Sequence, residues 1–448
     1  MNSQQSRRRF LQTTTAGGVL SATLPSFLAA TLQQLQADTE GRAVQATAGH
    51  DAPILVVLQL AGGNDGLNTV VPFANDHYRK ARPKLGLDSD KVLKLSDELG
   101  LHPALTGFKS LYDAGQLAVL QGVGYPNPNR SHFRSTDIWM TASDSDRFSN
   151  RGWIGRYFDH ACAGADPTVG IAIGRQSPLA FSAQHPTGIA LENPDAYHAA
   201  ADELEESDSM AMMSSGKGKP GRKPGVSEGP AGIGNPSGTG GSVEQLSGGR
   251  VESGNVLDFL ERTAHDARSS SEQIRSVSAR VKNLAEYPAG KLANDLKLVS
   301  RLIAGGLNTR VYYVSQGGFD THQGQAGTHP RLLTELGESM KAFLADLKAL
   351  GQLDRVVVLT FSEFGRRVSE NASGGTDHGA AAPLFLCGGR VKPGVVGRHP
   401  SLAPGDLING DIAFHTDFRS VYATLLERWL KTESAPILGR SFPPMEFI

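Results

Sequence analysis

The chain has 448 residues, and its hydrophobic and charged contents of 39% and 20% are typical of a soluble globular protein. Its formal net charge of −1 argues against nucleic acid or an anionic membrane as a partner. The cysteines Cys162 and Cys387 have apolar neighbours, which favours separate buried thiols over a disulfide.

The N-terminal residues follow the order of a twin-arginine export signal. Residues 6–12 read SRRRFLQ, in which a polar residue precedes an arginine pair, a free position, Phe and Leu. The stretch 13–32 is less apolar than a spanning helix, and a small-residue cleavage pattern follows at 46–48. This order favours a signal over a basic amphipathic helix. We therefore expect residues 1–48 to direct export to the periplasm or cell surface of a bacterium through the twin-arginine translocase, with no stable membrane span.

The mature chain alternates apolar strands with amphipathic helices. The predicted strands are 53–60, 117–123, 310–314, 355–360 and 383–387, and the predicted helices are 105–114, one beginning near 131, 256–304, 332–350 and 421–430. This alternation predicts an α/β fold, a three-layer α/β/α sandwich around a mostly parallel sheet. Residues 207–253 are rich in Gly, Ser, Pro and Lys, which predicts a disordered insertion within one domain, 49–448, or alternatively an interdomain linker.

Polar side chains follow the first two strands where those strands end. Asp65 lies in the glycine-rich stretch after strand 53–60, where it is either an oxygen ligand of a metal ion or part of a plain turn. Ser131 follows strand 117–123 at a predicted helix N-terminus, where backbone N–H groups favour anions. Its hydroxyl is either a nucleophile activated by a metal or a simple helix cap.

The later strands are followed by denser groups of acidic and imidazole side chains. Asp320 and His322 follow strand 310–314, with His329 as a possible substitute for His322. The densest group follows strand 355–360 and contains Glu363, Arg366, Arg367, Asp377 and His378. Either arginine can bind an anionic ester oxygen or simply face solvent.

The carboxyl ends of parallel strands meet at one edge of a sheet, so these side chains are expected to converge there. Two divalent ions about 4 Å apart are held by roughly five or six nitrogen and oxygen ligands. The pattern therefore predicts a two-metal site whose ligands are Asp65, Asp320, His322, Glu363, Asp377 and His378. Such a mixed ligand set suits zinc, manganese, magnesium, calcium or iron.

Five motifs together resemble the twin-arginine-exported family called domain of unknown function 1501. They are GGNDGLN (62–68), PNRSHF (128–133), GGFDTH (317–322), SEFGRR (362–367) and TDHG (376–379). That family is similar to the alkaline-phosphatase-like superfamily, which includes phosphatases and sulfatases. The resemblance implies that Asp65 is the acid ending the first strand and that Ser131 is the nucleophile, with Ser135 as a weaker candidate.

The chain also departs from the superfamily pattern. The spacing between Asp320 and His322 is shorter than usual, and Glu363 stands where an Asp-His pair is normal. His378 resembles the final histidine ligand, for which His415 is an outside candidate. The cysteine signature of sulfatases is absent, which argues against a formylglycine-type sulfatase.

These features predict a metal-dependent hydrolase of phosphate or sulfate esters in which Ser131 or water attacks and Arg366 binds the anion. The substrate is expected to be a small or polymer-linked anionic ester. The altered ligand pattern leaves an alternative, a non-catalytic binding or cell-surface assembly protein. A redox protein with an organic cofactor is disfavoured, because no Cys-x-x-Cys or nucleotide fingerprint follows a strand.

Overall fold

The computed structural model describes residues 52–185, 188–202 and 253–448. The predicted signal at 1–48 and residues 207–252 of the predicted insertion lie outside the described residues. Within the described part, no helix combines the length and apolarity needed to cross a membrane.

A nine-stranded sheet forms the centre of the fold. Its strands are β1 (Ile54–Leu60), β5 (Leu117–Gly124), β6 (Gly170–Ile173), β7 (Ile189–Leu191), β8 (Val311–Gln316), β9 (Val356–Phe361), β12 (Ala382–Gly388), β13 (Gly394–Val396) and β14 (Thr416–Asp417). The order is β13-β5-β12-β9-β1-β8-β6-β7, and β14 pairs with β5. β12 runs antiparallel to β5 and β9, whereas the other pairs are parallel. The sheet is therefore mostly parallel, as predicted.

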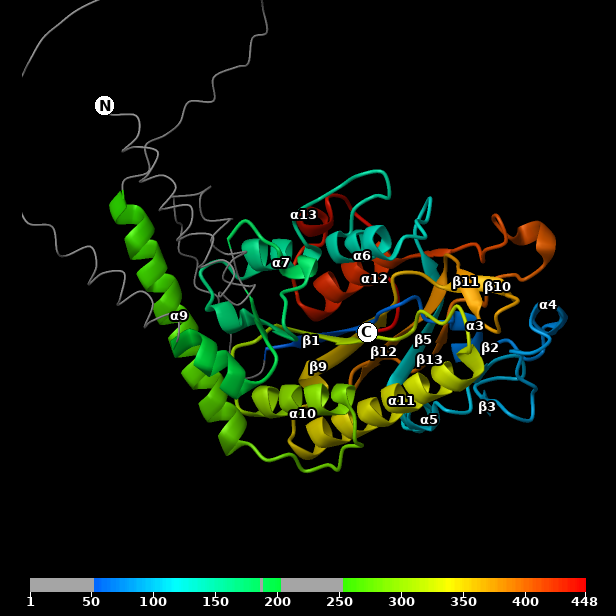
Figure 1. Ribbon diagram of the computed structural model, residues 1–448, viewed down its shortest axis with the longest axis horizontal. Coiled ribbons are helices and arrows are strands. Elements are labelled where there is room, and N and C mark those ends of the chain that lie inside the picture. The colour runs from blue at the N-terminus through cyan, green and yellow to red at the C-terminus, as the bar shows by residue number, and fades with distance from the viewer. Residues whose placement is uncertain (1–51, 186–187, 203–252) are drawn as a thin grey trace, which may run out of the picture.

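Helices cover both faces of this sheet (Figure 1). One face packs against α5 (Thr106–Asp113), α10 (Lys291–Ala304) and α11 (Gln325–Ala349), and the other against α6 (His132–Thr141), α7 (Trp153–Ala161) and α12 (Phe418–Thr424). Alternate residues of β1 enter the two cores: Val56 lies in the first and Val57 in the second. Every residue of β1 is buried, because an unbroken apolar run suits a strand covered on both sides. The predicted three-layer α/β/α architecture is confirmed.

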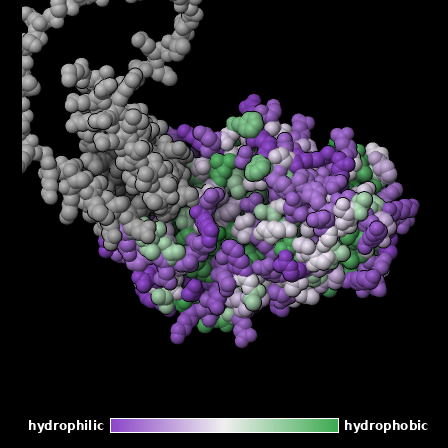
Figure 2. Space-filling view, in the orientation of Figure 1, coloured by the Kyte–Doolittle hydropathy of each residue, from purple (hydrophilic) through white to green (hydrophobic). Residues whose placement is uncertain are grey.

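Nine further α-helices and β-strands complete the described fold. They are α3 (Gly66–Thr69), β2 (Val70–Val71), α4 (Asp76–Ala81), β3 (Leu93–Lys94), β4 (Gly100–Leu101), α9 (Ser253–Arg280), β10 (Arg366–Glu370), β11 (Thr376–His378) and α13 (Ala435–Leu438). Cys162 and Cys387 are separate buried thiols in the cores on opposite faces of the sheet. On the face shown in Figure 2, hydrophilic residues predominate and apolar ones form small separate groups.

The start of α11 and the pair β10–β11 are among the features that differ from the sequence prediction. Helix α11 begins at Gln325 rather than 332, because Pro330 is accommodated inside the helix although proline usually favours the first turn. The antiparallel pair β10–β11 was not predicted, since the charged sequence of β10 lacks an apolar alternation. This pair carries His378 to the carboxyl edge of the sheet.

Candidate metal centre

Four chain segments meet at the carboxyl edge of β1, β8 and β9. They are the loop after β1, the loop after β8, the β10–β11 pair and the amino end of α6. The first two loops approach closely at Gly62, which has φ +118°, and a Cβ there would lie 2.4 Å from the backbone nitrogen of Asp320. Only glycine permits this approach. At the same edge, His132 at the amino end of α6 contacts Asp320, which is more than 180 residues away in the chain.

Three histidines direct their Nε2 atoms at the carboxylate of Asp320. The Nε2 atoms of His322 and His378 each lie 3.2 Å from Oδ1 of Asp320, and that of His132 lies 3.4 Å from Oδ2. The Nε2 atoms of His322 and His378 are 2.8 Å apart. The donor atoms of His132, Asp320 and His378 all lie within 4.8 Å of one another.

The other ring nitrogen of each histidine faces an acceptor. Nδ1 of His132 lies 2.8 Å from Glu363 Oε1, and Nδ1 of His322 lies 3.2 Å from Asp377 Oδ1. Nδ1 of His378 lies 2.8 Å from the carbonyl oxygen of Arg130. An Nδ1–H that donates to each acceptor leaves the Nε2 lone pair free, which is the tautomer that metal-binding histidines adopt.

The donor set fits a metal ion in its chemistry, and the distances from Asp320 fit in spacing. Around a tetrahedral ion with bonds near 2.0–2.1 Å, neighbouring donor atoms are roughly 3.3 Å apart. The separations of 3.2 and 3.4 Å from Asp320 match this value, whereas the 2.8 Å between the Nε2 atoms of His322 and His378 is shorter. Nε2 of His132 is buried and makes no hydrogen bond, so this nitrogen is available to bind a metal ion. We call His132, Asp320, His322 and His378 the His/Asp cluster.

Arg366 keeps Asp320 ionised. Its Nη2 lies 2.7 Å from Asp320 Oδ1. Burial alone would raise the pKa of Asp320, but hydrogen bonds from Arg366 and His378 and the positive charge of Arg366 outweigh it and lower that pKa to about 2. The side chains of Asp320 and His322 are 48% and 43% exposed, so the cluster is open to a ligand from solvent.

Arg366 itself is buried and fully engaged. Besides Asp320, it donates to the carbonyl oxygens of Gly62, Gly63, Phe319 and Thr376. These bonds join the loop after β1, the loop after β8 and β11. In this structure Arg366 therefore holds these segments together, and its guanidinium has no donor facing solvent.

Asp65 lies apart from the His/Asp cluster. It is fully buried, and its Oδ2 is 2.5 Å from Nη1 of Arg82. Burial would raise the pKa of Asp65, yet the charge and hydrogen bond of Arg82 lower it overall. The alternative histidines also lie elsewhere: His329 contacts Asn64 Oδ1, and His415 contacts the carbonyl oxygen of Arg398.

The two candidate nucleophiles have different surroundings. Ser131 is exposed at the N-cap of α6, and its side chain makes no capping hydrogen bond. Ser135 is buried, and its hydroxyl contacts the carbonyl oxygen of Glu363 and the hydroxyl of Tyr125. Ser131 thus occupies the predicted N-cap position of α6, but its hydroxyl does not cap the helix.

Sequence reasoning missed His132, the residue after Ser131 in the PNRSHF motif. The available signal was an imidazole in the first turn of a helix that begins at the carboxyl edge of the sheet. Of the predicted ligands, the structure brings Asp320, His322 and His378 together, and it places Glu363 and Asp377 behind His132 and His322.

Residues 259–438 match the family model described as protein of unknown function DUF1501, and this range contains three of the five motifs, GGFDTH, SEFGRR and TDHG. A search of curated proteins found no match.

Similar solved structures include the sulfatase PsFucS1 from Pseudoalteromonas sp., which is 11% identical, with 93% of this chain and 72% of that chain covered and a TM-score of 0.33. The lipoteichoic acid synthase LtaP from Listeria monocytogenes is 10% identical, with 84% and 79% covered and a TM-score of 0.30. The phosphonate monoester hydrolase SpPMH from Silicibacter pomeroyi is 9% identical, with 88% and 78% covered and a TM-score of 0.31. These TM-scores are below 0.5, so the α/β/α architecture is assigned from the sheet order and the two cores of the chain itself.

Proposed function

We propose that this chain is a metal-dependent hydrolase of sulfate or phosphate esters and that the His/Asp cluster holds its metal. The observation that carries the proposal is the convergence of three Nε2 atoms on Asp320 while each Nδ1 faces its own acceptor. A bound divalent ion would polarise an ester oxygen and lower the pKa of a nearby hydroxyl or water.

The protein's own groups supply the rest of the mechanism. Asp320 stays ionised because Arg366 lowers its pKa. Glu363 holds His132 in one orientation through Nδ1, and Asp377 does the same for His322. Ser131 stands at the amino end of α6, where backbone N–H groups favour an anionic ester. Its hydroxyl makes no capping hydrogen bond, and the next residue in the chain is the cluster residue His132. We therefore propose Ser131 as the nucleophile.

We propose one ion rather than the two expected from the sequence. Arg82 already neutralises Asp65, which was expected to be a metal ligand. Glu363 and Asp377 contact the outer nitrogens of histidines, where carboxylates orient ligands rather than bind the metal. Arg366 supplies a fixed positive charge beside Asp320, which disfavours a second cation next to that carboxylate.

The test is hydrolysis of aryl sulfate, phosphate monoester, phosphate diester and phosphonate ester substrates by the mature protein loaded separately with zinc, manganese, magnesium and calcium. We expect one ester class to be hydrolysed and His378→Ala to abolish the activity. His77→Ala is a matched control, because His77 is exposed and lies outside the cluster. A metal-loaded protein that hydrolyses none of these esters would contradict the proposal.

One observation favours the alternative, a non-catalytic binding protein. Every guanidinium nitrogen of Arg366 donates to a protein acceptor, so the expected anion-binding arginine is occupied. A protein that binds one metal and an anionic ester but releases no product would support this alternative.

Export through the twin-arginine route is also our proposal, supported by the residues at 6–12. Replacing Arg7 and Arg8 with lysine preserves their charge but removes the arginine pair. We expect this variant to stay in the cytoplasmic fraction as the uncleaved form. Normal appearance of the variant in the periplasmic fraction would contradict the proposal.

A further inference from the structure

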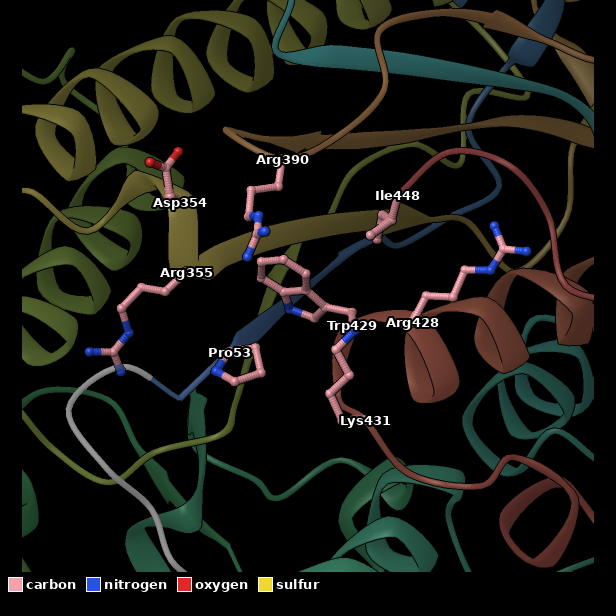
Figure 3. Close-up of a pocket in the computed structure, with 8 residues that line it drawn as sticks. All are labelled: Pro53, Asp354, Arg355, Arg390, Arg428, Trp429, Lys431 and Ile448. Carbon is pink, nitrogen blue, oxygen red and sulfur yellow. The ribbon is translucent and has the colours of Figure 1, made fainter.

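A cationic cavity lies at the opposite edge of the sheet from the metal centre. It has a volume of about 540 Å³ (Figure 3). Pro53 and Arg355 line it just before β1 and β9 begin, whereas the metal centre follows the ends of these same strands. A strand of seven residues spans roughly 20 Å, so the two places are separate.

Four basic side chains line this cavity. They are Arg355, Arg390, Arg428 and Lys431, and Asp354 is the one acidic side chain in the lining. Figure 3 shows the guanidinium of Arg390 pointing toward Trp429, while the carboxylate of Asp354 points the other way. Even with Asp354 in the lining and Glu446 paired to Arg428, the basic side chains outnumber the acidic ones, and an anion would offset this excess of positive charge.

The four basic side chains differ in their hydrogen bonds and ion pairs. Nη1 of Arg428 lies 2.7 Å from Oε1 of Glu446, and Nε of Arg355 donates to the carbonyl oxygen of Ala52 at 3.2 Å. Arg390 and Lys431 are exposed and, within residues 52–185, 188–202 and 253–448, have no hydrogen bond or ion pair from their side chains. Arg355 and Arg428 are thus held by other groups, and Figure 3 shows their guanidinium groups pointing away from Arg390. Arg390 and Lys431 are the two available cations.

Lys431 is held by an unusual backbone conformation. Its φ is +60°, in the left-handed region that glycine normally occupies after a helix. A lysine in this conformation is strained, and such strain clusters at functional sites. Lys431 follows the turn that carries Trp429, whose indole donates to the carbonyl oxygen of Ile54 at 2.9 Å. The backbone of Lys431 is therefore anchored next to the core, beside the cavity.

We infer that this cavity binds a sulfate or phosphate group. Guanidinium groups pair with such oxyanions through two parallel hydrogen bonds, and lysine adds a point charge. The volume exceeds that of one bare oxyanion, so the group has room to be carried on a larger molecule. This inference is independent of the proposed hydrolase, because no residue of the His/Asp cluster lines the cavity.

The test is isothermal titration calorimetry of the mature protein with three probes: inorganic sulfate, inorganic phosphate and a sulfated oligosaccharide. The experiment uses the His378→Ala background as well as wild type, so that binding at the metal centre is counted separately. The variant Arg390→Gln/Lys431→Gln removes the two available cations. The control Arg331→Gln/Lys341→Gln removes the same charge from exposed positions on α11.

We expect the His378→Ala protein to bind at least one probe, the cavity variant to bind it at least tenfold more weakly, and the control to match its parent. Binding of the inorganic ions alone would identify a free anion as the ligand, and preference for the oligosaccharide would identify a group on a larger molecule. Lys431→Gly relieves the strained backbone and should lose affinity while melting no earlier than wild type. Equal binding by the cavity variant and control, or no binding of any probe, would overturn the inference, whatever the hydrolase assays show.

Discussion

Nδ1 of His132 lies 2.8 Å from Oε1 of Glu363, although the two residues are 231 positions apart in the chain. The same oxygen accepts a hydrogen bond from the backbone N–H of Gly62 at 2.8 Å. Glu363 therefore links the amino end of α6 to the loops after β1 and β9, and it fixes the direction in which the Nε2 lone pair of His132 points.

This relationship predicts that Glu363 strengthens metal binding without touching the metal. Glu363→Gln keeps an acceptor but removes the charge, and we expect the metal dissociation constant to rise about 10- to 100-fold. Competition with a coloured chelator measures the change. Glu98→Gln, at an exposed carboxylate, should bind as wild type does. Unchanged affinity in Glu363→Gln would show that its contact with His132 does not tune the site.

The two serines of α6 should separate activity from stability. Ser131→Ala removes the proposed nucleophile, so we expect kcat to fall at least about 100-fold while the free energy of unfolding changes little. Ser135→Ala leaves the buried hydroxyl of Tyr125 without this partner and should cost about 1–3 kcal/mol of stability. Kinetic assays and urea unfolding of both variants test this. Full activity in Ser131→Ala would point to water as the nucleophile.

The buried pair of Asp65 and Arg82 should be structural. Asp65→Ala leaves the fully buried guanidinium of Arg82 uncompensated, which should cost about 3–5 kcal/mol. Asp65→Asn, which keeps the shape, should retain the full metal content. Urea unfolding and elemental analysis of the variants provide the two readouts. Loss of metal from a folded Asp65→Asn protein would place Asp65 in the metal site, as the sequence first suggested.

Acid should destabilise the protein through His329. Burial lowers the pKa of His329 to about 3, against 6.5 for an ordinary histidine. Below pH 6.5 the unfolded chain binds a proton that the folded chain excludes. The contribution of His329 is therefore complete above pH 6.5 and is lost as the pH falls toward 3, by up to about 1.4 kcal/mol per pH unit.

Urea unfolding between pH 7 and pH 4.5 measures this dependence. His329→Gln should flatten the slope of unfolding free energy against pH, whatever its effect at pH 7. His77→Gln changes an exposed histidine and should leave the slope as in wild type. Equal slopes in wild type and His329→Gln would show that His329 titrates normally in the folded chain.

The fold was largely predictable because its strands are continuous apolar runs. β1, β5, β8 and β9 lie within a few residues of their predicted bounds, since burial on both faces leaves a strong signal in the sequence. β6 and β7 were missed because they are only four and three residues long. The β10–β11 pair depends on contacts with the loops around Arg366, which local sequence does not reveal.

The candidate site was predictable only in part. Strand ends indicated Asp320, His322 and His378, because the topology brings such positions together. A shift of a few ångströms decides whether a carboxylate binds a metal directly or contacts the outer nitrogen of a histidine. The sequence around Glu363 and Asp377 is compatible with either role. His132 was overlooked because a serine in the preceding position offered a more familiar role.

Elemental analysis of the purified mature protein beside His132→Ala and Asp65→Asn measures whether the His/Asp cluster holds a single metal ion. We expect one equivalent of a divalent metal in wild type and in Asp65→Asn, and none in His132→Ala. Two equivalents in wild type, or one equivalent that survives in His132→Ala, would contradict this expectation.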